Sequence, residues 1–174
     1  FCLLRRYTDR WFKRGLKNPF VRVLAGTGMV IAITLLIGHN ECNGLGYAIA
    51  GTALDGETRP LNFVFKLVLT LITLGCGIRG GEISPNIFIG ATFGCTAAGF
   101  LGMNPCLAAS VGMIGTLSSV TNSTIAVFIM GLELISFTPE AAVCFALTCL
   151  ITHLTSGTLC LYTGQETHRM PLKI

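Results

Sequence analysis

Apolar residues in this chain fall into long runs that glycine, proline or short polar stretches interrupt. Residues 20–37 form the first run, and its length suits a membrane crossing, which needs roughly 20 apolar residues. Pro19 precedes this run and fits the first turn of a helix. Residues 60–73 form a second run, interrupted only by Lys66, and the glycines at 75 and 77 end it. The pattern therefore predicts two membrane helices here.

Shorter apolar pieces occupy the rest of the chain. Glycine and charge around 43–47 and 55–57 indicate a short, re-entrant helix between two turns. Small residues recur between 90 and 99, so the helix that contains them is expected to approach a neighbour closely. Further helices are predicted from the loop at 79–85 to about Gly102, from Asn104 with loosening around Ser118–Ser119, from residues 121–124, from Pro139 to about His153, and in a short piece at 156–165.

Charge is scarce for a chain of this size. Of 174 residues, 52% are hydrophobic and 11% are charged, whereas soluble domains carry about 25% charged residues. Residues 83–132 include no Asp, Glu, Lys or Arg, so this stretch is expected to face lipid or protein. Irregular backbone at membrane depth survives where it packs in protein or lines a polar cavity. We therefore predict an all-α polytopic membrane protein with broken and re-entrant helices.

Several other classes are disfavoured. The Lys/Arg cluster between residues 5 and 22 is typical of juxtamembrane anchors, and no nucleic-acid motif accompanies it. The eight cysteines include no Cys-x-x-Cys pair and are interpreted as buried thiols, so neither a disulfide framework, a metal site nor a cofactor is predicted. The chain begins with Phe1 and lacks a signal peptide, and we interpret it as truncated.

The loop Gly80-Gly81-Glu82-Ile83-Ser84-Pro85 has the form of an anion site. A permeant anion in a low dielectric needs partial positive charge, which the free N–H groups at a helix N-terminus supply. Two glycines allow close backbone approach, and Pro85 suits the start of a helix. No Gly-Lys-Ser/Thr follows, which disfavours a phosphate-binding Walker loop. The loop alone is equally compatible with a simple turn between helices.

Residues 80–94 resemble the second-half ion-binding loop and following helix of CLC anion transporters. Chloride-type members usually carry Gly-Gly-Ile-Phe-x-Pro there, whereas Glu82 and Ser84 are more similar to the Gly-Gly-Glu-Val-Thr-Pro of the fluoride-exporting branch, with Ser in place of Thr. Residues 122–126 and 129–134 resemble that branch's Asn-Thr-Pro-Leu-Ala and Met-Gly-x-Glu-Leu segments, although the Pro is missing. Residues 156–165 resemble its terminal Ser-Gly-x-x-x-Ile-Tyr-x-x-Gln.

The resemblance implies the second of two inverted repeats in a homodimer, in a bacterial inner membrane. Residues 1–18 would end a preceding helix, and 19–174 would form the repeat itself. The N-terminal half of the same protein, with a gating glutamate, would complete the pathway. The anion, fluoride or chloride, would be bound by Gly81, Glu82, Ile83 and Ser84 through the loop's N–H groups, and by the Tyr162 hydroxyl.

Proton coupling implies a carboxylate that can be neutralised inside the pathway, which burial permits. Glu82 is the candidate. Asn122 either caps the helix it opens or lines the pathway, and Tyr162 taken alone also fits an interfacial anchor. Glu133 is interpreted as a structural acid and His153 as an interfacial or structural residue.

The leading hypothesis is fluoride/proton antiport, with protons and membrane lipid as the other partners. The main alternative is a chloride channel or chloride/proton antiporter of the same fold, from which the ionisable side chain in Glu82-x-Ser84 distinguishes it. An intramembrane enzyme that uses Glu133 and His153, or a Cys nucleophile, lacks any motif that links these residues. A non-transporting subunit or gene fragment is a further alternative. The basic residues near the N-terminus predict that this end of the chain faces the cytoplasm. The family's topology places the same end outside, and we follow the family's topology.

Overall fold

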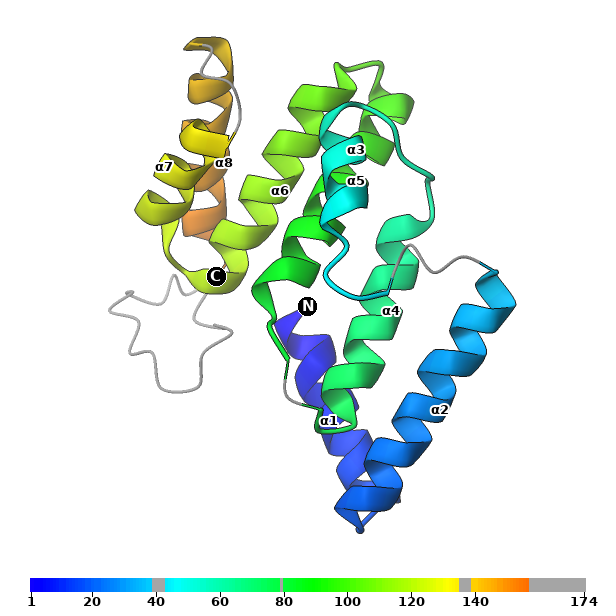
Figure 1. Ribbon diagram of the computed structural model, residues 1–174. Helices are drawn as coiled ribbons and strands as arrows, with labels where there is room; N and C mark the ends of the chain where they lie inside the picture. Colours follow the sequence, from blue (N-terminus) through cyan, green and yellow to red (C-terminus); the bar gives the residue numbers. More distant parts are fainter. Residues whose placement is uncertain (39–42, 79, 135–138, 157–174) are drawn as a thin grey trace.

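Every regular element is a helix in the part of the chain that the computed structural model describes, residues 1–38, 43–78, 80–134 and 139–156 (Figure 1). The helices are α1 (Cys2–Gly15), α2 (Pro19–Ile37), α3 (Tyr47–Leu54), α4 (Asn62–Gly75), α5 (Ile83–Leu101), α6 (Pro105–Thr121), α7 (Thr124–Leu134) and α8 (Pro139–Thr155). Their order agrees with the sequence prediction, and so do their approximate bounds except near the end of α6; the short piece predicted at 156–165 lies almost wholly outside the described residues.

The antiparallel hairpin of α5 and α6 lies at the centre of the molecule (Figure 1). Gly102 ends α5 in the left-handed conformation at φ 66°, and the Asn104 side chain caps α6 by accepting from the Cys106 N–H at 3.0 Å. Backbones touch between the two helices. A Cβ at Gly94 would lie 2.1 Å from the Ala108 carbonyl oxygen, and one at Gly112 would lie 2.3 Å from the Gly90 carbonyl oxygen. The small residues of α5 thus permit the close approach that was expected of them.

The other helices pack around this hairpin. The main buried cluster joins α5 and α6 to α7 and α8, and its largest members are Met113, Ile114, Leu117, Val127 and Phe145. On the opposite side α4 packs on α5, and α1 packs on the end of α4, where Thr8 and Phe12 lie against Gly75. Arg22 of α2 donates from Nε to the Cys76 carbonyl oxygen at 3.0 Å, which ties α2 to the same end of α4.

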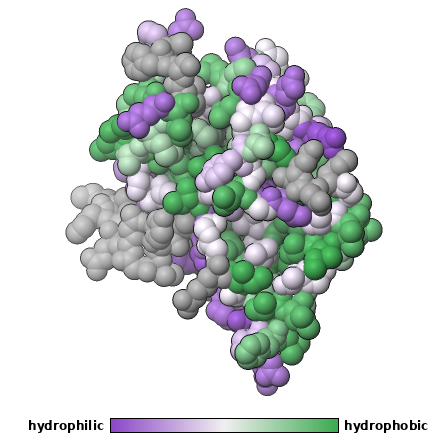
Figure 2. Space-filling view, viewed as in Figure 1, coloured by the Kyte–Doolittle hydropathy of each residue, from purple (hydrophilic) through white to green (hydrophobic). Residues whose placement is uncertain are grey.

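Several apolar faces are exposed in the described part of the chain. Figure 2 shows apolar side chains gathered over α2, where Phe20, Leu24 and Leu36 are exposed. Among the described helices, α2 is the one long and apolar enough to cross a membrane by length and composition; α4, α6, α7 and α8 are apolar but shorter. One side of α8 likewise carries exposed apolar side chains, those of Leu147, Leu150, Ile151 and Leu154. These faces fit lipid or further protein rather than water.

Two local predictions near the end of α6 are wrong. Ser118 and Ser119 do not loosen the helix, because Ser118 is buried and accepts a hydrogen bond from Thr152 of α8 at 3.1 Å. Thr121 belongs to α6, and α7 begins only at Thr124. Asn122 stands between them with φ 56°, so it ends α6 in the left-handed conformation.

Candidate functional site

Several helix ends meet at one end of the α5–α6 hairpin. Because the two helices are antiparallel, the start of α5 lies at the same end as the end of α6. Thr116 of α6 donates to the Asn86 carbonyl oxygen of α5 at 3.1 Å, which fixes this register. The Ser156 hydroxyl donates to Asn122 Oδ1 at 3.2 Å, so the end of α8 reaches the same place. The loop predicted to bind an anion therefore lies where three helix ends converge.

The N-terminus of α5 supplies unbonded amide groups to this place. The helix begins at Ile83, with Glu82 at its N-cap and Pro85 in its first turn. The backbone N–H groups of Glu82, Ile83 and Ser84 have no hydrogen-bond acceptor among the described residues. The Glu82 side chain does not cap the helix either. Free N–H groups at the positive end of a helix form an environment that favours an anion.

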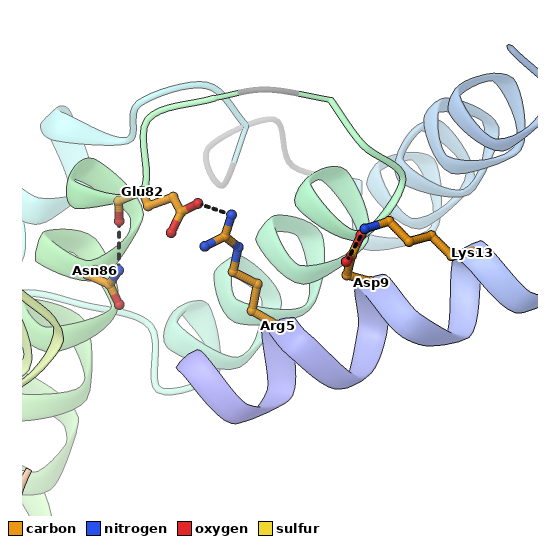
Figure 3. Close-up of polar contacts among 5 residues, drawn as sticks. All are labelled: Arg5, Asp9, Lys13, Glu82 and Asn86. Atoms are coloured by element: carbon orange, nitrogen blue, oxygen red, sulfur yellow. Dashed lines mark hydrogen bonds and ion pairs between the residues drawn. The ribbon is translucent and has the colours of Figure 1, made fainter. Parts of the chain in front are cut away.

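Glu82 is fixed through both its main chain and its side chain (Figure 3). Its carbonyl oxygen accepts from the buried Asn86 amide at 2.6 Å. Its Oε1 atom forms an ion pair with Nη2 of Arg5, on α1, at 2.5 Å, and the carboxylate-bearing side chain is 12% exposed. The second oxygen, Oε2, is buried and has no hydrogen-bond partner within the described part of the chain. One oxygen of this carboxyl group is therefore held by Arg5, and the other is buried and unpaired among the described residues.

Ser84, two residues further on, is held from another helix. Its hydroxyl lies 2.9 Å from that of Tyr47, the first residue of α3, and either group can be the donor. Tyr47 is 57% exposed, so its ring lies at the surface of the described structure. The start of α5 thus carries a carboxyl group and a hydroxyl group, each with a partner from a distant segment.

The turn before α3 determines where Tyr47 lies. Gly46 adopts φ 73°, and a Cβ there would lie 2.5 Å from the Phe88 ring of α5. The buried Lys66 donates from Nζ to the Gly44 carbonyl oxygen at 2.6 Å, and the same nitrogen is 5.1 Å from the Phe88 ring centre. The charge of Lys66, which interrupts an otherwise apolar helix, is thereby used to hold the 43–46 turn against α5.

The predicted site residues are brought together in part. Glu82, Ile83 and Ser84 form the start of α5, Gly81 directly precedes them and is exposed, and Asn122 lies at the same end of the hairpin. The Nδ2 atom of Asn122 is buried without a partner among the described residues, so a buried donor is available there. Because Asn122 ends α6, it does not cap the helix that follows.

Tyr162 and the rest of the terminal 157–174 segment lie outside the described residues. Of the two other residues singled out from the sequence, Glu133 is exposed near the end of α7, and His153 Nδ1 lies 3.2 Å from the Thr124 hydroxyl. The described part of the chain includes no group of three His, Cys, Asp or Glu side chains that could hold a metal ion.

Arg5 and Tyr47 are the contacts that sequence reasoning missed. Arg5 is one of several basic residues in α1, and its neighbours give no sign that it differs from them. Tyr47 follows Gly44 and Gly46, which indicated a turn but not its partner. Both contacts join segments far apart in the chain, so no local pattern could reveal them.

Apolar helices and unbonded N–H groups at a helix N-terminus fit an ion-transport protein of the membrane. Residues 1–157 match the model of the voltage-gated chloride channel (CLC) family, and this chain belongs to that family. A curated relative from Pseudomonas syringae pv. tomato, the "Chloride/fluoride channel protein", is 31% identical over 171 residues, which cover 92% of this chain and 37% of the relative.

The fold is also that of a solved structure, the crystal structure of a CLC-type fluoride/proton antiporter. The two superpose with a TM-score of 0.85 at 25% sequence identity, over 92% of this chain and 40% of the other. The chain therefore has the all-helical CLC fold, and it spans less than half the length of either protein it matches.

Proposed function

We propose that this chain is part of a fluoride/proton antiporter. The N–H groups of the Gly80–Pro85 loop and the hydroxyl of Tyr162 would bind the anion, and Glu82 would carry the proton. The observation that carries the proposal is the pair of side chains at the start of α5: a largely buried carboxyl group at Glu82 with one open oxygen, and a hydroxyl group at Ser84. A passive chloride pore has no need of an ionisable group there.

The same proposal extends to the rest of the protein, its oligomeric state and its membrane. Residues 1–18 would end one helix and lead into a second repeat at 19–174, and the N-terminal half of the protein would complete the pathway. We further propose a homodimer in a bacterial inner membrane, in contact with lipid, that acts as a transporter and not as an enzyme. The exposed apolar faces of α2 and α8 support burial against lipid or protein.

Chloride transport is the second candidate, as a channel or as a chloride/proton antiporter. The observation that favours it is the name of the Pseudomonas relative, which includes chloride as well as fluoride. The two candidates differ in the anion carried, and the channel form of the second also differs in that it does not need Glu82.

The test uses the whole protein in liposomes, with fluoride efflux, chloride efflux and proton movement recorded separately for wild type and Glu82→Gln. We expect fluoride to be preferred, and the substitution to lower proton-coupled fluoride flux about tenfold or more, equivalent to ~1.4 kcal/mol of barrier. Glu133→Gln is the matched control, because it neutralises an exposed carboxylate on α7. Chloride efflux at an equal or greater rate, indifferent to Glu82, would favour the chloride candidate instead.

A further inference from the structure

Among the described residues, two ion pairs involve α1, and they differ in kind (Figure 3). Asp9 and Lys13 lie one turn apart on α1 itself, at 2.6 Å, and their side chains are 36% and 58% exposed. Arg5 instead reaches the N-cap of α5, where the carboxylate side chain is 12% exposed. The first pair is of the common surface type, which contributes little to stability. The second joins two helices at the candidate site.

The placement of Arg5 depends on how α1 is packed. Phe12 is the buried residue of α1, and it lies with Thr8 against Gly75 at the end of α4. A Cβ at Gly75 would lie 2.6 Å from Thr8 Cγ2, so the helix approaches as closely as a glycine allows. Arg5 lies about one turn before Thr8. This position directs the Arg5 side chain towards the loop that leads into α5 (Figure 3).

The two carboxylate oxygens of Glu82 have different surroundings. Oε1 is bonded to Arg5, while Oε2 is buried without a partner in the described part of the chain. The main chain of Glu82 is meanwhile held by Asn86 from within α5. The orientation of the carboxyl group about its own axis is therefore determined by Arg5.

We propose that Arg5 is the positioning residue of proton coupling: it holds Glu82 by Oε1 so that Oε2 takes up and releases the transported proton. This inference rests on the proposed function. The proton reaches Oε2 from water on one side of the membrane and leaves to the other. While Glu82 is ionised, Arg5 neutralises it. When Glu82 is protonated, the positive charge of Arg5 remains beside the N-terminus of α5 and favours the anion there.

Arg5→Gln tests the proposal in the whole protein in liposomes. Fluoride flux and the fluoride-to-proton ratio, taken from the reversal potential, are compared with wild type, with Arg5→Lys, and with Arg6→Gln as the matched control on the same helix. We expect Arg5→Gln to lower proton movement per fluoride several-fold, Arg5→Lys to restore most of it, and Arg6→Gln to leave it unchanged. A wild-type ratio in Arg5→Gln would overturn the inference.

A double variant covers the case in which Arg5→Gln alone leaves a buried carboxylate unpaired and does not fold. Arg5→Gln/Glu82→Gln removes both charges, and its flux should match that of Glu82→Gln, because Arg5 acts through Glu82. A further loss in the double variant would show that Arg5 acts elsewhere. Wild type is measured in the same vesicles: if it carries no fluoride, the proposed function fails, whereas normal coupling in wild type and Arg5→Gln alike contradicts only the role of Arg5.

Discussion

The hydroxyl of Ser84 has a single hydrogen, and its partner decides where that hydrogen points. If the Tyr47 hydroxyl donates across the 2.9 Å contact, Ser84 accepts with its oxygen and keeps its own hydrogen for an anion. Such a chain of two hydroxyl groups polarises each member, which strengthens the final donor. Tyr47 would then contribute to anion binding without contact with the anion.

Tyr47→Phe removes this one oxygen atom and keeps the ring. The loss of a hydrogen bond costs about 0.5–1.5 kcal/mol, so we expect the KM for fluoride to rise several-fold. The measurement is the concentration dependence of fluoride efflux. Tyr7→Phe is the control, since Tyr7 lies on α1 and is 70% exposed. Equal KM values for Tyr47→Phe and wild type would mean that Ser84 needs no second hydroxyl.

At the scale of the helices, the contact between α5 and α6 holds the start of α5 in place. The approach is close enough for backbone atoms to touch, and three glycines make it possible: Gly90, Gly94 and Gly112. Elsewhere on α5 a side chain would meet no obstacle, as at Gly99, where nothing lies within 4 Å of an added Cβ. Gly90 and Gly94 of α5 are therefore required for the contact with α6, whereas Gly99 is not.

Gly94→Ala should destabilise the protein, because its Cβ would lie 2.1 Å from the Ala108 carbonyl oxygen, and backbone atoms cannot move aside cheaply. Overpacking of this kind costs ~1–3 kcal/mol, which a lowered Tm of the purified whole protein in detergent would report. Gly99→Ala on the same helix should leave the Tm equal or slightly raised. Similar Tm values for the two variants would contradict the close contact.

Helix positions were largely predictable from the sequence, whereas the contacts at the site were not. Pro19, Asn104-Pro105, Gly102 and Pro139 mark helix ends through chemistry that acts within one turn, so a local pattern is enough. The same reasoning failed at Asn122, since an Asn fits both the start of a helix and a left-handed end, and only the packing of Ser118 extends α6 to that point. Arg5 and Tyr47 meet their partners across the fold, which local reasoning cannot reach.

For the whole molecule, the turn between α1 and α2 and the turn between α5 and α6 lie at opposite ends (Figure 1). Exposed residues mark both ends: Lys17 in the first turn and Cys106 just after the second. Membrane-spanning helices between these turns would separate them by the width of the bilayer.

Thiol labelling of the whole protein in sealed vesicles tests this arrangement. We expect Cys106, and a cysteine introduced by Lys17→Cys, to react with a membrane-impermeant maleimide from opposite sides, with labelled peptides identified by mass spectrometry. Cys95 and Cys149 are buried and should react only after denaturation. Labelling of both test sites from one side would contradict the arrangement. The side on which Lys17→Cys reacts also decides between the charge-based and family-based orientations.

The touching backbones of α5 and α6 also limit which parts of this half can move during a transport cycle. Sliding or rolling of one helix along the other would bring side chains into a contact where a Cβ at Gly94 or Gly112 already has no room, so we expect the amide groups at the start of α5 to form a fixed frame. In the proposed transporter, alternating access at this end would therefore fall to side-chain torsions and not to displacement of these two helices. Such rotamer changes are intrinsically far faster than helix shifts, so the slow step of the proposed cycle should lie in proton delivery or in the N-terminal half proposed above.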